Sequence, residues 1–237
     1  MLSLVLSGGC IDIITPDPAV RYVAFGDSMT KGPSEKDYHE FLRERLGMKP
    51  ETFANEGHGG ETTDDGLQRL VALLNNEIYP NAEVLLYWEG GNNVTDFIQH
   101  HDPLLLLSPD DDDYLFAGSL AADLDGIQDD IESAIRAAHD AGLEVRVATY
   151  FHLRESIDQC PALPLDILLP YQAERANVYI GMLNERIRQG ALSEGATLVD
   201  VETINGTLHV DEDNYHNCNH LSAQGNELVA DLFYEAE

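Results

Sequence analysis

The sequence predicts an α/β protein, a three-layer α/β/α sandwich in which helices cover both faces of a central, mostly parallel, five-stranded sheet. Two observations lead to this prediction. Five short apolar segments with the character of strands alternate along the chain with segments whose apolar residues recur at helical spacing, and this alternation is typical of parallel sheets. The chain of 237 residues, 43% of them hydrophobic, is also long enough to bury the core of one such domain.

The first part of the chain contributes three strands and two helices. The apolar run at residues 21–25 is the first strand, and residues 38–46 are predicted to form a helix because their apolar side chains share one helical face. Residues 52–55 form a short strand that enters a glycine-rich turn. A second amphipathic helix follows at residues 63–74, and the apolar segment Val84–Trp88 is a buried strand.

The alternation resumes after a segment without clear periodicity at residues 97–118. A long amphipathic helix is predicted at residues 121–141, where Gly142 ends it, because its apolar residues form one continuous stripe. The apolar run at residues 143–150 is the fourth strand. Residues 151–169 contain several prolines and are predicted to form a loop.

The remaining elements complete the sheet and close the chain. Residues 170–190 are predicted to form a helix, residues 197–201 the fifth strand, and residues 221–234 the final helix. No internal repeat divides this pattern, so we expect one domain that spans residues 20–237.

Residues 1–19 are expected to form a leader and linker ahead of that domain. Cys10 follows Ser7-Gly8-Gly9, which resembles the end of a bacterial lipoprotein signal, where small residues precede a lipidated cysteine. Under this interpretation the protein is extracytoplasmic or secreted, and a lipid on Cys10 is its only link to a membrane. The alternative is an ordinary N-terminal segment with an incidental cysteine.

The chain is strongly acidic, with 43 Asp and Glu residues against 13 Lys and Arg residues and a formal net charge of -30. Nucleic acid and anionic membrane surfaces are therefore not expected as partners, because both attract clustered basic side chains. Two interpretations of the acidity stay open: adaptation to high salt, which screens self-repulsion, or a protein that its charge keeps soluble. No uninterrupted apolar run of the sequence reaches the length of a transmembrane helix.

Ser28 is the most informative residue of the chain. It follows the first predicted strand in the turn Gly26-Asp27-Ser28, where a hydroxyl can be held at the end of a buried strand and aimed into a cleft, as nucleophilic catalysis requires. Such a turn by itself is more often a plain connection between a strand and a helix. The interpretation therefore depends on the other segments that reach the same place.

Three further residues are candidates to complete a site around Ser28. Gly60 lies in the turn after the second predicted strand, Asn92 follows the glycine turn after the third, and His220 lies near the C-terminus. In open parallel sheets, ligands bind beyond the carboxyl ends of the strands. We therefore expect Ser28, Gly60 and Asn92 to share one rim of the sheet. The structural alternatives are ordinary turns, a helix N-cap at Asn92 and a histidine without a catalytic role.

With these segments in order, the chain resembles the SGNH hydrolases, also called GDSL esterases and lipases, from about Tyr22 to Leu232. Four blocks carry the resemblance: Gly26-Asp27-Ser28, the segment 55–63 that contains Gly60, Gly90-Gly91-Asn92-Asn93, and Asn217-Cys218-Asn219-His220 followed by Gly225. The resemblance implies the flavodoxin-like fold of that family and a serine esterase without metal or organic cofactor, of the lipase/acylhydrolase or the carbohydrate deacetylase type.

The resemblance also implies a role for each residue. Ser28 attacks the ester carbonyl, and His220 accepts its proton and later passes it to the leaving alcohol. The backbone N–H groups of Ser28 and Gly60 and the side-chain amide of Asn92 then stabilise the oxyanion. The implied partner is a small-molecule, glycan or lipid ester, and we expect a monomer by default.

The sequence departs from the family's pattern at Asn217, where the family usually has the Asp that orients the histidine. An amide oxygen can accept a hydrogen bond from Nδ1, but it brings no charge to stabilise the imidazolium. Asp213 or Asp211 is an alternative source of a carboxylate, and Asp213 also begins a competing Asp-x-x-His register that ends at His216. The remaining outcome is a catalytically impaired binding protein with the SGNH fold.

Cys160 and Cys218 fall in loops that should meet at the same rim. In an exported protein we expect them to form a disulfide that ties the histidine loop to its neighbour, and the alternative is two unrelated buried thiols. The loops at residues 97–118 and 151–169 should shape the substrate pocket, with apolar residues that either accept an acyl chain or pack in the core.

Overall fold

The computed structural model describes residues 4–7, 10–13, 15–156, 160 and 166–237, and it confirms the predicted parallel sheet. Five strands lie side by side in the order β4-β3-β5-β6-β7, and every neighbouring pair is parallel. The strands are β3 (Tyr22–Gly26), β4 (Phe53–Gly57), β5 (Val84–Trp88), β6 (Glu144–Ala148) and β7 (Thr197–Val199).

The register of the three strands β4, β3 and β5 brings their carboxyl ends to one level. Gly26 at the end of β3 pairs with Gly57 at the end of β4 and with Trp88 at the end of β5. The residues that follow these strands therefore emerge along the same rim, which is where open parallel sheets bind ligands.

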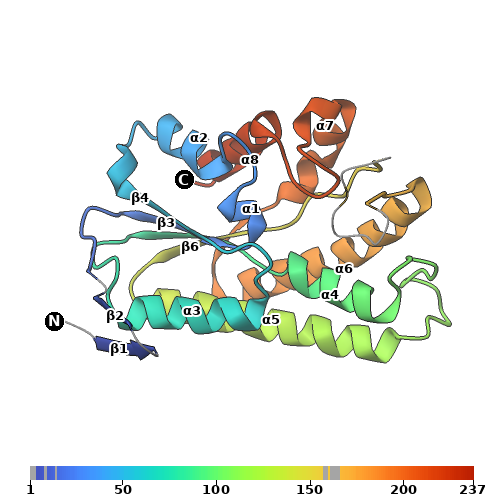
Figure 1. The fold of residues 1–237 in the computed structure, drawn as a ribbon, viewed down its shortest axis with the longest axis horizontal. Coiled ribbons are helices and arrows are strands. Elements are labelled where there is room, and N and C mark those ends of the chain that lie inside the picture. The colour runs from blue at the N-terminus through green and yellow to red at the C-terminus, as the bar shows by residue number, and fades with distance from the viewer. Residues whose placement is uncertain (1–3, 8–9, 14, 157–159, 161–165) are drawn as a thin grey trace.

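Helices cover both faces of the sheet and confirm the predicted three-layer sandwich (Figure 1). One face carries α3 (Thr63–Asn75), α4 (Gly91–His101), α5 (Ala117–Asp140) and α6 (Pro170–Glu194). The other side carries α1 (Ser28–Lys31), α2 (Tyr38–Arg45), α7 (Asn205–Val210) and α8 (Ala223–Glu235). Short 3-10 helices lie in the connections: η1 (Pro50–Thr52), η2 (Val201–Ile204) and η3 (Glu212–Asn214).

The structure corrects the prediction that residues 97–118 are irregular from their start. Helix α4 runs on to His101, and it buries Val94, Phe97 and Ile98, which stand at the spacing of one helical face. The glycine pair before Asn92 indicates a turn, and this local signal concealed the helix that begins at Gly91. Likewise, α5 begins at Ala117, four residues earlier than predicted.

Two further stretches contain elements that the sequence did not indicate. Within residues 1–19, predicted as leader and linker, β1 (Leu4–Ser7) and β2 (Cys10–Ile13) pair as an antiparallel hairpin. After β7, η2 and α7 fold back over the end of the sheet before the histidine loop. Both elements are too short to show a clear period in the sequence.

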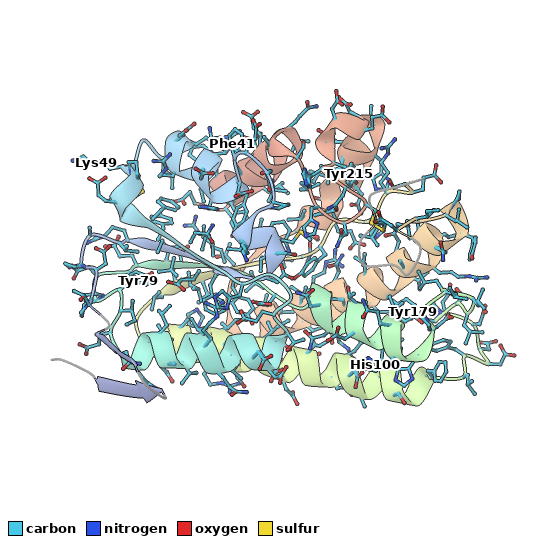
Figure 2. The ribbon with its side chains drawn as sticks, in the orientation of Figure 1. Phe41, Lys49, Tyr79, His100, Tyr179 and Tyr215 are labelled. Carbon is cyan, nitrogen blue, oxygen red and sulfur yellow. A yellow bond between two sulfur atoms is a disulfide. The ribbon has the colours of Figure 1, made fainter. Side chains whose placement is uncertain are left out.

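Aromatic rings join the α2 and α8 layer to the sheet, and side chains fill the space between the ribbons (Figure 2). Tyr38 stacks on Phe233 with ring centroids 4.8 Å apart and meets Trp88 edge-on at 5.4 Å. All three side chains are fully buried. Each such pair contributes about 0.5–1.5 kcal/mol beyond the area that it buries, so the cluster anchors the strand end at Trp88.

Two glycines allow the backbone to approach itself closely at the rim. A Cβ atom on Gly57 would lie 2.1 Å from the backbone nitrogen of Lys31 in α1, and one on Gly26 would lie 2.2 Å from the carbonyl oxygen of Trp88. Because the crowding atoms belong to the backbone, no side-chain rotation can relieve such contacts. Any larger residue at Gly57 must push α1 away from β4.

We therefore predict that Gly57→Ala lowers the free energy of unfolding by about 1–3 kcal/mol, the usual cost of overpacking. The control is Gly126→Ala in α5, where a Cβ atom meets nothing within 4 Å. This control should stabilise the protein by about 0.5–1 kcal/mol, because alanine loses less conformational entropy in a helix. Urea unfolding of the two variants measures both values, and a neutral Gly57→Ala would contradict the prediction.

Candidate active site

The turn that presents Ser28 is held from two sides. Ser28 begins α1 directly after β3, and the carboxylate of Asp27 caps this turn: its Oδ1 accepts the N–H of Met29 at 2.8 Å and its Oδ2 accepts the hydroxyl of Tyr150 at 2.6 Å. Burial raises the pKa of Asp27 to about 6, while the hydrogen bonds from Tyr150 and Met29 oppose this rise because they favour the ionised form. Asp27 thus fixes the backbone from which the Ser28 hydroxyl projects.

The structure brings His220 to Ser28 across 192 positions of sequence. His220 Nε2 lies 2.9 Å from Ser28 Oγ, within hydrogen-bond distance. The histidine stands in the loop between η3 and α8, and an isolated bridge between Tyr215 and Leu221 closes this loop at its base. The backbone carbonyl of His220 accepts the N–H of His216 at 2.9 Å, and this hydrogen bond fixes the backbone that carries the imidazole ring.

Asn217 orients the imidazole ring through a single oxygen. Its Oδ1 lies 3.0 Å from His220 Nδ1 and accepts the backbone N–H groups of Asn219 at 3.0 Å and of His220 at 2.9 Å. Backbone N–H groups can only donate, so the oxygen of the amide, and not its NH₂ group, must face the ring. Nδ1 therefore carries the ring proton, and Nε2 presents its lone pair to Ser28.

The alternative carboxylates of the loop are used elsewhere. Asp211 caps η3 by accepting the N–H of Asp213 at 3.0 Å, and its other oxygen accepts the amide of Gln224 at 3.0 Å. The side chain of Asp213 is exposed, and the hydrogen-bonding position at His220 Nδ1 is filled by Asn217. The competing register that ends at His216 leaves that residue exposed, while His220 is the histidine that reaches Ser28.

Burial keeps His220 neutral. Burial and, to a smaller extent, the nearby His216 together lower the pKa of the imidazole to about 4. Asn217 brings no negative charge that would raise it again. The ring is consequently ready to accept a proton at neutral pH, but the imidazolium that results has no charged partner.

Gly60 and Asn92 lie on the same rim as Ser28. Gly60 adopts a φ of 85°, a conformation that side chains disfavour, and a Cβ atom on its neighbour Gly59 would come 3.8 Å from the Cβ of Ser28. Asn92 Nδ2 donates one hydrogen bond to the carbonyl of Glu61 at 2.9 Å. An amide nitrogen has two hydrogens, and Asn92 lines the same pocket as Ser28.

That pocket has a cavity volume of about 100 Å³ and opens to solvent. Beyond Ser28 and Asn92 its walls are mostly apolar and come from α4 (Val94, Thr95, Ile98), α6 (Ala176, Ile180, Leu183) and the adjoining loops (Leu105, Phe151, Leu153, Leu168). The two loops predicted to shape the pocket thus take part in it. Their leucines divide between two roles: Leu105 is buried in the wall, whereas Leu104 and Leu106 are exposed. Leu163 and Leu165 lie outside the described residues.

A disulfide joins Cys160 to Cys218 and ties the histidine loop to the loop after β6 (Figure 2). Both cysteines are buried and line the pocket. The bond closes a loop with a sequence separation of 58 residues, for which the chain-entropy estimate gives a stabilisation of about 4 kcal/mol. It therefore restrains the segment between the orienting residue Asn217 and His220.

Two other observations concern metal ions and membranes. Among the described residues, no group of three or more His, Cys, Asp and Glu side chains is arranged to hold a metal ion. Within the same part of the chain, no helix has both the length and the apolar character needed to cross a bilayer.

Sequence reasoning missed two residues of this region. Tyr150, the donor to Asp27, follows β6, and nothing in the sequence indicates its partner. Glu89 follows the apolar strand β5 directly and is 1% exposed. A charged residue at the end of a buried strand, beside a glycine turn, was a signal that could have identified the second of these.

Comparison with known proteins agrees with the sequence resemblance. A family model described as GDSL-like Lipase/Acylhydrolase family matches residues 24–228, a range that contains Ser28, Gly60, Asn92 and His220. No curated protein matched the chain significantly.

Solved structures of similar fold include hydrolases of several kinds. A member of the lipolytic protein G-D-S-L family from Veillonella parvula is similar with a TM-score of 0.62 at 15% identity, covering 91% of this chain and 97% of that chain. The lipase Lip_vut3 from a goat rumen metagenome gives 0.62 at 16%, covering 92% and 97%. A catalytic mutant of Axe2, an acetylxylan esterase from Geobacillus stearothermophilus, gives 0.60 at 15%, covering 92% and 93%. At such identities the likeness shows a shared fold.

The orientation of His220 yields a prediction that does not depend on turnover. In the wild type, an NMR titration of the ring should give a pKa of about 4. In Asn217→Asp the carboxylate replaces the amide oxygen beside Nδ1, so the pKa of His220 should rise, because an adjacent negative charge favours the imidazolium. A ring pKa that is unchanged in this variant would show that Asn217 is not the partner of Nδ1.

Proposed function

The chain belongs to the GDSL-like lipase/acylhydrolase family, and we propose that it is a serine esterase that hydrolyses carboxylic esters at Ser28. One observation carries the proposal: His220 Nε2 lies 2.9 Å from Ser28 Oγ while Nδ1 of the same ring lies 3.0 Å from Asn217 Oδ1. A nucleophile, a base and a group that orients the base thus stand in one line beside an apolar pocket, as covalent catalysis requires.

In the first half of the reaction, Ser28 Oγ attacks the ester carbonyl carbon as Nε2 of His220 takes the hydroxyl proton. The carbonyl π electrons move to oxygen and form a tetrahedral oxyanion. When this intermediate collapses, the bond to the alkoxy group breaks, and the imidazolium passes its proton to the leaving alcohol. The acyl group stays on Ser28.

The oxyanion is stabilised by donors that are in place before the substrate binds. These are the backbone N–H groups of Ser28 and Gly60 and the second amide hydrogen of Asn92, whose first hydrogen is anchored on Glu61. Loss of one such donor typically costs about 2.7–4 kcal/mol in the barrier. In the second half, water attacks the acyl carbon as His220 takes a proton from it, and the bond to Ser28 Oγ then breaks as His220 returns that proton to Oγ and the acid is released.

The absence of a charge at position 217 affects the rate more than the geometry. Asn217 holds the tautomer that a carboxylate would hold, but it leaves the imidazolium without electrostatic stabilisation. In a protease, the exchange of the orienting Asp for Asn lowers kcat by about 10⁴, in part because the wrong tautomer forms. Since the backbone donors prevent that tautomer here, we infer a smaller penalty.

We propose an ester with an aliphatic acyl group as the substrate. The apolar walls contributed by α4 and α6 extend from Ser28 to Leu105 and Leu168, and they can bury a hydrocarbon chain at roughly 25 cal/mol per Å² of apolar surface. Acetyl ester hydrolysis on a glycan is the second candidate, favoured by the similarity of fold to an acetylxylan esterase.

The disulfide between Cys160 and Cys218 supports a proposal about location. Disulfides persist in oxidising compartments, so we propose that the protein acts outside the cytoplasm. We further propose that it acts as a monomer on a small-molecule, glycan or lipid ester. Lipidation of Cys10 would add an anchor to a membrane that the acidic surface does not itself attract.

The decisive experiment compares the wild type with Ser28→Ala on p-nitrophenyl butyrate and with a fluorophosphonate probe. The wild type should hydrolyse the ester and become labelled at Ser28, and the variant should lose at least about 10³-fold in kcat, because removal of a nucleophile leaves only the oxyanion donors. Equal rates would refute the esterase. Labelling of Ser28 would refute the alternative that the protein is a binding protein only.

A chain-length series tests the acyl pocket. Ile180→Phe places a larger side chain on the wall formed by α6 and so narrows the pocket. For p-nitrophenyl octanoate, kcat/KM should fall at least about tenfold, because each buried CH₂ contributes about 0.8 kcal/mol. For p-nitrophenyl acetate, kcat/KM should stay within about twofold of the wild-type value. Leu192→Phe is the matched control, because Leu192 lies on the same helix and is 84% exposed. If both esters lose activity equally, the acyl chain does not occupy this pocket.

A further inference from the structure

Glu89 is a buried carboxyl group that the esterase mechanism does not use. It directly follows β5, precedes the glycine turn that leads to Asn92, and is 1% exposed. Among the described residues, no N–H or hydroxyl group donates to its carboxyl oxygens, and its hydrogen-bond partner is the carboxyl group of Glu61. A buried polar group of this kind is rare in native proteins and calls for an explanation.

The carboxyl groups of Glu89 and Glu61 meet over Gly66 in α3. A Cβ atom on Gly66 would lie 3.2 Å from Glu89 Oε1 and 3.4 Å from Glu61 Oε2, so this glycine leaves the space that both carboxyl groups occupy. Two adjacent buried carboxyl groups cannot both be ionised at low cost, and one of them keeps a proton.

Arg69 decides which of the two is ionised. Its Nε donates to Glu61 Oε1 at 2.7 Å and its Nη2 donates to Glu61 Oε2 at 2.6 Å, a bidentate pair. The guanidinium also lies 3.9 Å from the ring centroid of Phe25. Burial raises the pKa of Glu61, but the hydrogen bonds from Arg69 and Glu89 and the charge of Arg69 outweigh this effect, so the pKa lies below its ordinary value. Burial raises the pKa of Glu89 well above its ordinary value, and Asp27 and Glu61 add to that rise. Glu89 is therefore the neutral partner.

Glu61 is also the residue that connects two of the proposed oxyanion donors. It directly follows Gly60 in the chain, and its backbone carbonyl accepts the amide of Asn92 at 2.9 Å. A second link lies beside it, where the N–H of Thr63 donates to Asn93 Oδ1 at 3.0 Å. The turn that carries Gly60 is thus tied to the segment that carries Asn92 through contacts made at Glu61 and at Thr63.

We propose that protonated Glu89 is a positioning residue: by holding the carboxylate of Glu61, it keeps Gly60 and Asn92 in place around the oxyanion. This inference rests on the proposed esterase function. Glu89 touches neither the substrate nor the reacting atoms, and it acts through Glu61.

The charges around Glu89 set the expected dependence on pH. Asp27 faces it from the turn after β3, and Glu61 faces it from the turn after β4. Arg69 reaches it from α3. The phenol of Tyr87 belongs to β5 itself, and the phenol of Tyr150 comes from the segment after β6. Arg69 is the one cation of this group. When Glu89 loses its proton at alkaline pH, its carboxylate repels those of Glu61 and Asp27. The turn at Gly60 then shifts and kcat falls.

The test compares Glu89→Leu with Glu89→Gln on p-nitrophenyl butyrate. Glu89→Leu removes the hydrogen bond to Glu61, so kcat should fall by about tenfold or more, short of the 10²–10³-fold loss that follows complete removal of a donor, while KM changes little. Glu89→Gln restores a donor that cannot ionise. It should recover kcat at neutral pH and lose the alkaline decline that the wild type shows. The control is Glu56→Gln, which removes the charge of the other carboxylate that Arg69 Nη1 contacts, at 3.3 Å, and should leave the alkaline decline in place.

Infrared spectroscopy supplies a readout that needs no turnover. The folded wild type at pH 8 should show the C=O stretch of a protonated carboxyl group, and Glu89→Gln should lack it. Absence of this band in the wild type overturns the proposal, even if the protein proves inactive. The proposal is also overturned if the wild type is active and its alkaline decline persists in Glu89→Gln. If Ser28→Ala is inactive in that case, the esterase function still stands and only the role of Glu89 is refuted.

Discussion

Three N–H groups converge on one oxygen, Oδ1 of Asn217, and the chemistry of the whole site depends on this convergence. The two backbone donors orient the amide, the amide orients the imidazole, and the imidazole presents its lone pair to Ser28. A carboxylate in the same position would accept the same three hydrogen bonds. The amide therefore preserves the geometry of the usual triad and gives up only its charge, which separates two contributions that are normally combined in one residue.

The sheet provides the frame on which this loop can act. Because β4, β3 and β5 end in register, Gly60, Ser28 and Asn92 leave the sheet along one rim. The histidine loop comes from far along the chain, and its position depends on the bridge between Tyr215 and Leu221, on η3 and on the disulfide. The proposed nucleophile and oxyanion donors are thus placed by backbone pairing, whereas the proposed base is placed by loop contacts and a covalent bond.

One physical cause explains the ionisation of the site in a protein of net charge -30. Burial disfavours charge, so it raises the pKa of Asp27 and Glu89 and lowers that of His220. The acidic residues that give the protein its charge are largely solvated, while the carboxyl groups beside the site are capped, paired with Arg69 or protonated. Where few free charges surround a partly buried site, fixed N–H dipoles act strongly on a developing oxyanion.

The sequence by itself determined the layers of the fold and the residues to examine. Apolar runs of strand length and helical periodicity are local properties, so the parallel sheet and its main helices could be predicted from them, as could the rim where Ser28, Gly60 and Asn92 emerge. Only the tertiary structure decided the rest. The helix that begins at Gly91 is stabilised by packing that outweighs its glycine turn, and the orientation of Asn217 is set by donors that its loop brings together. The contact between Glu89 and Glu61 joins residues on different strands and turns. Such contacts depend on distances between side chains in the folded protein, which no periodicity along the chain records.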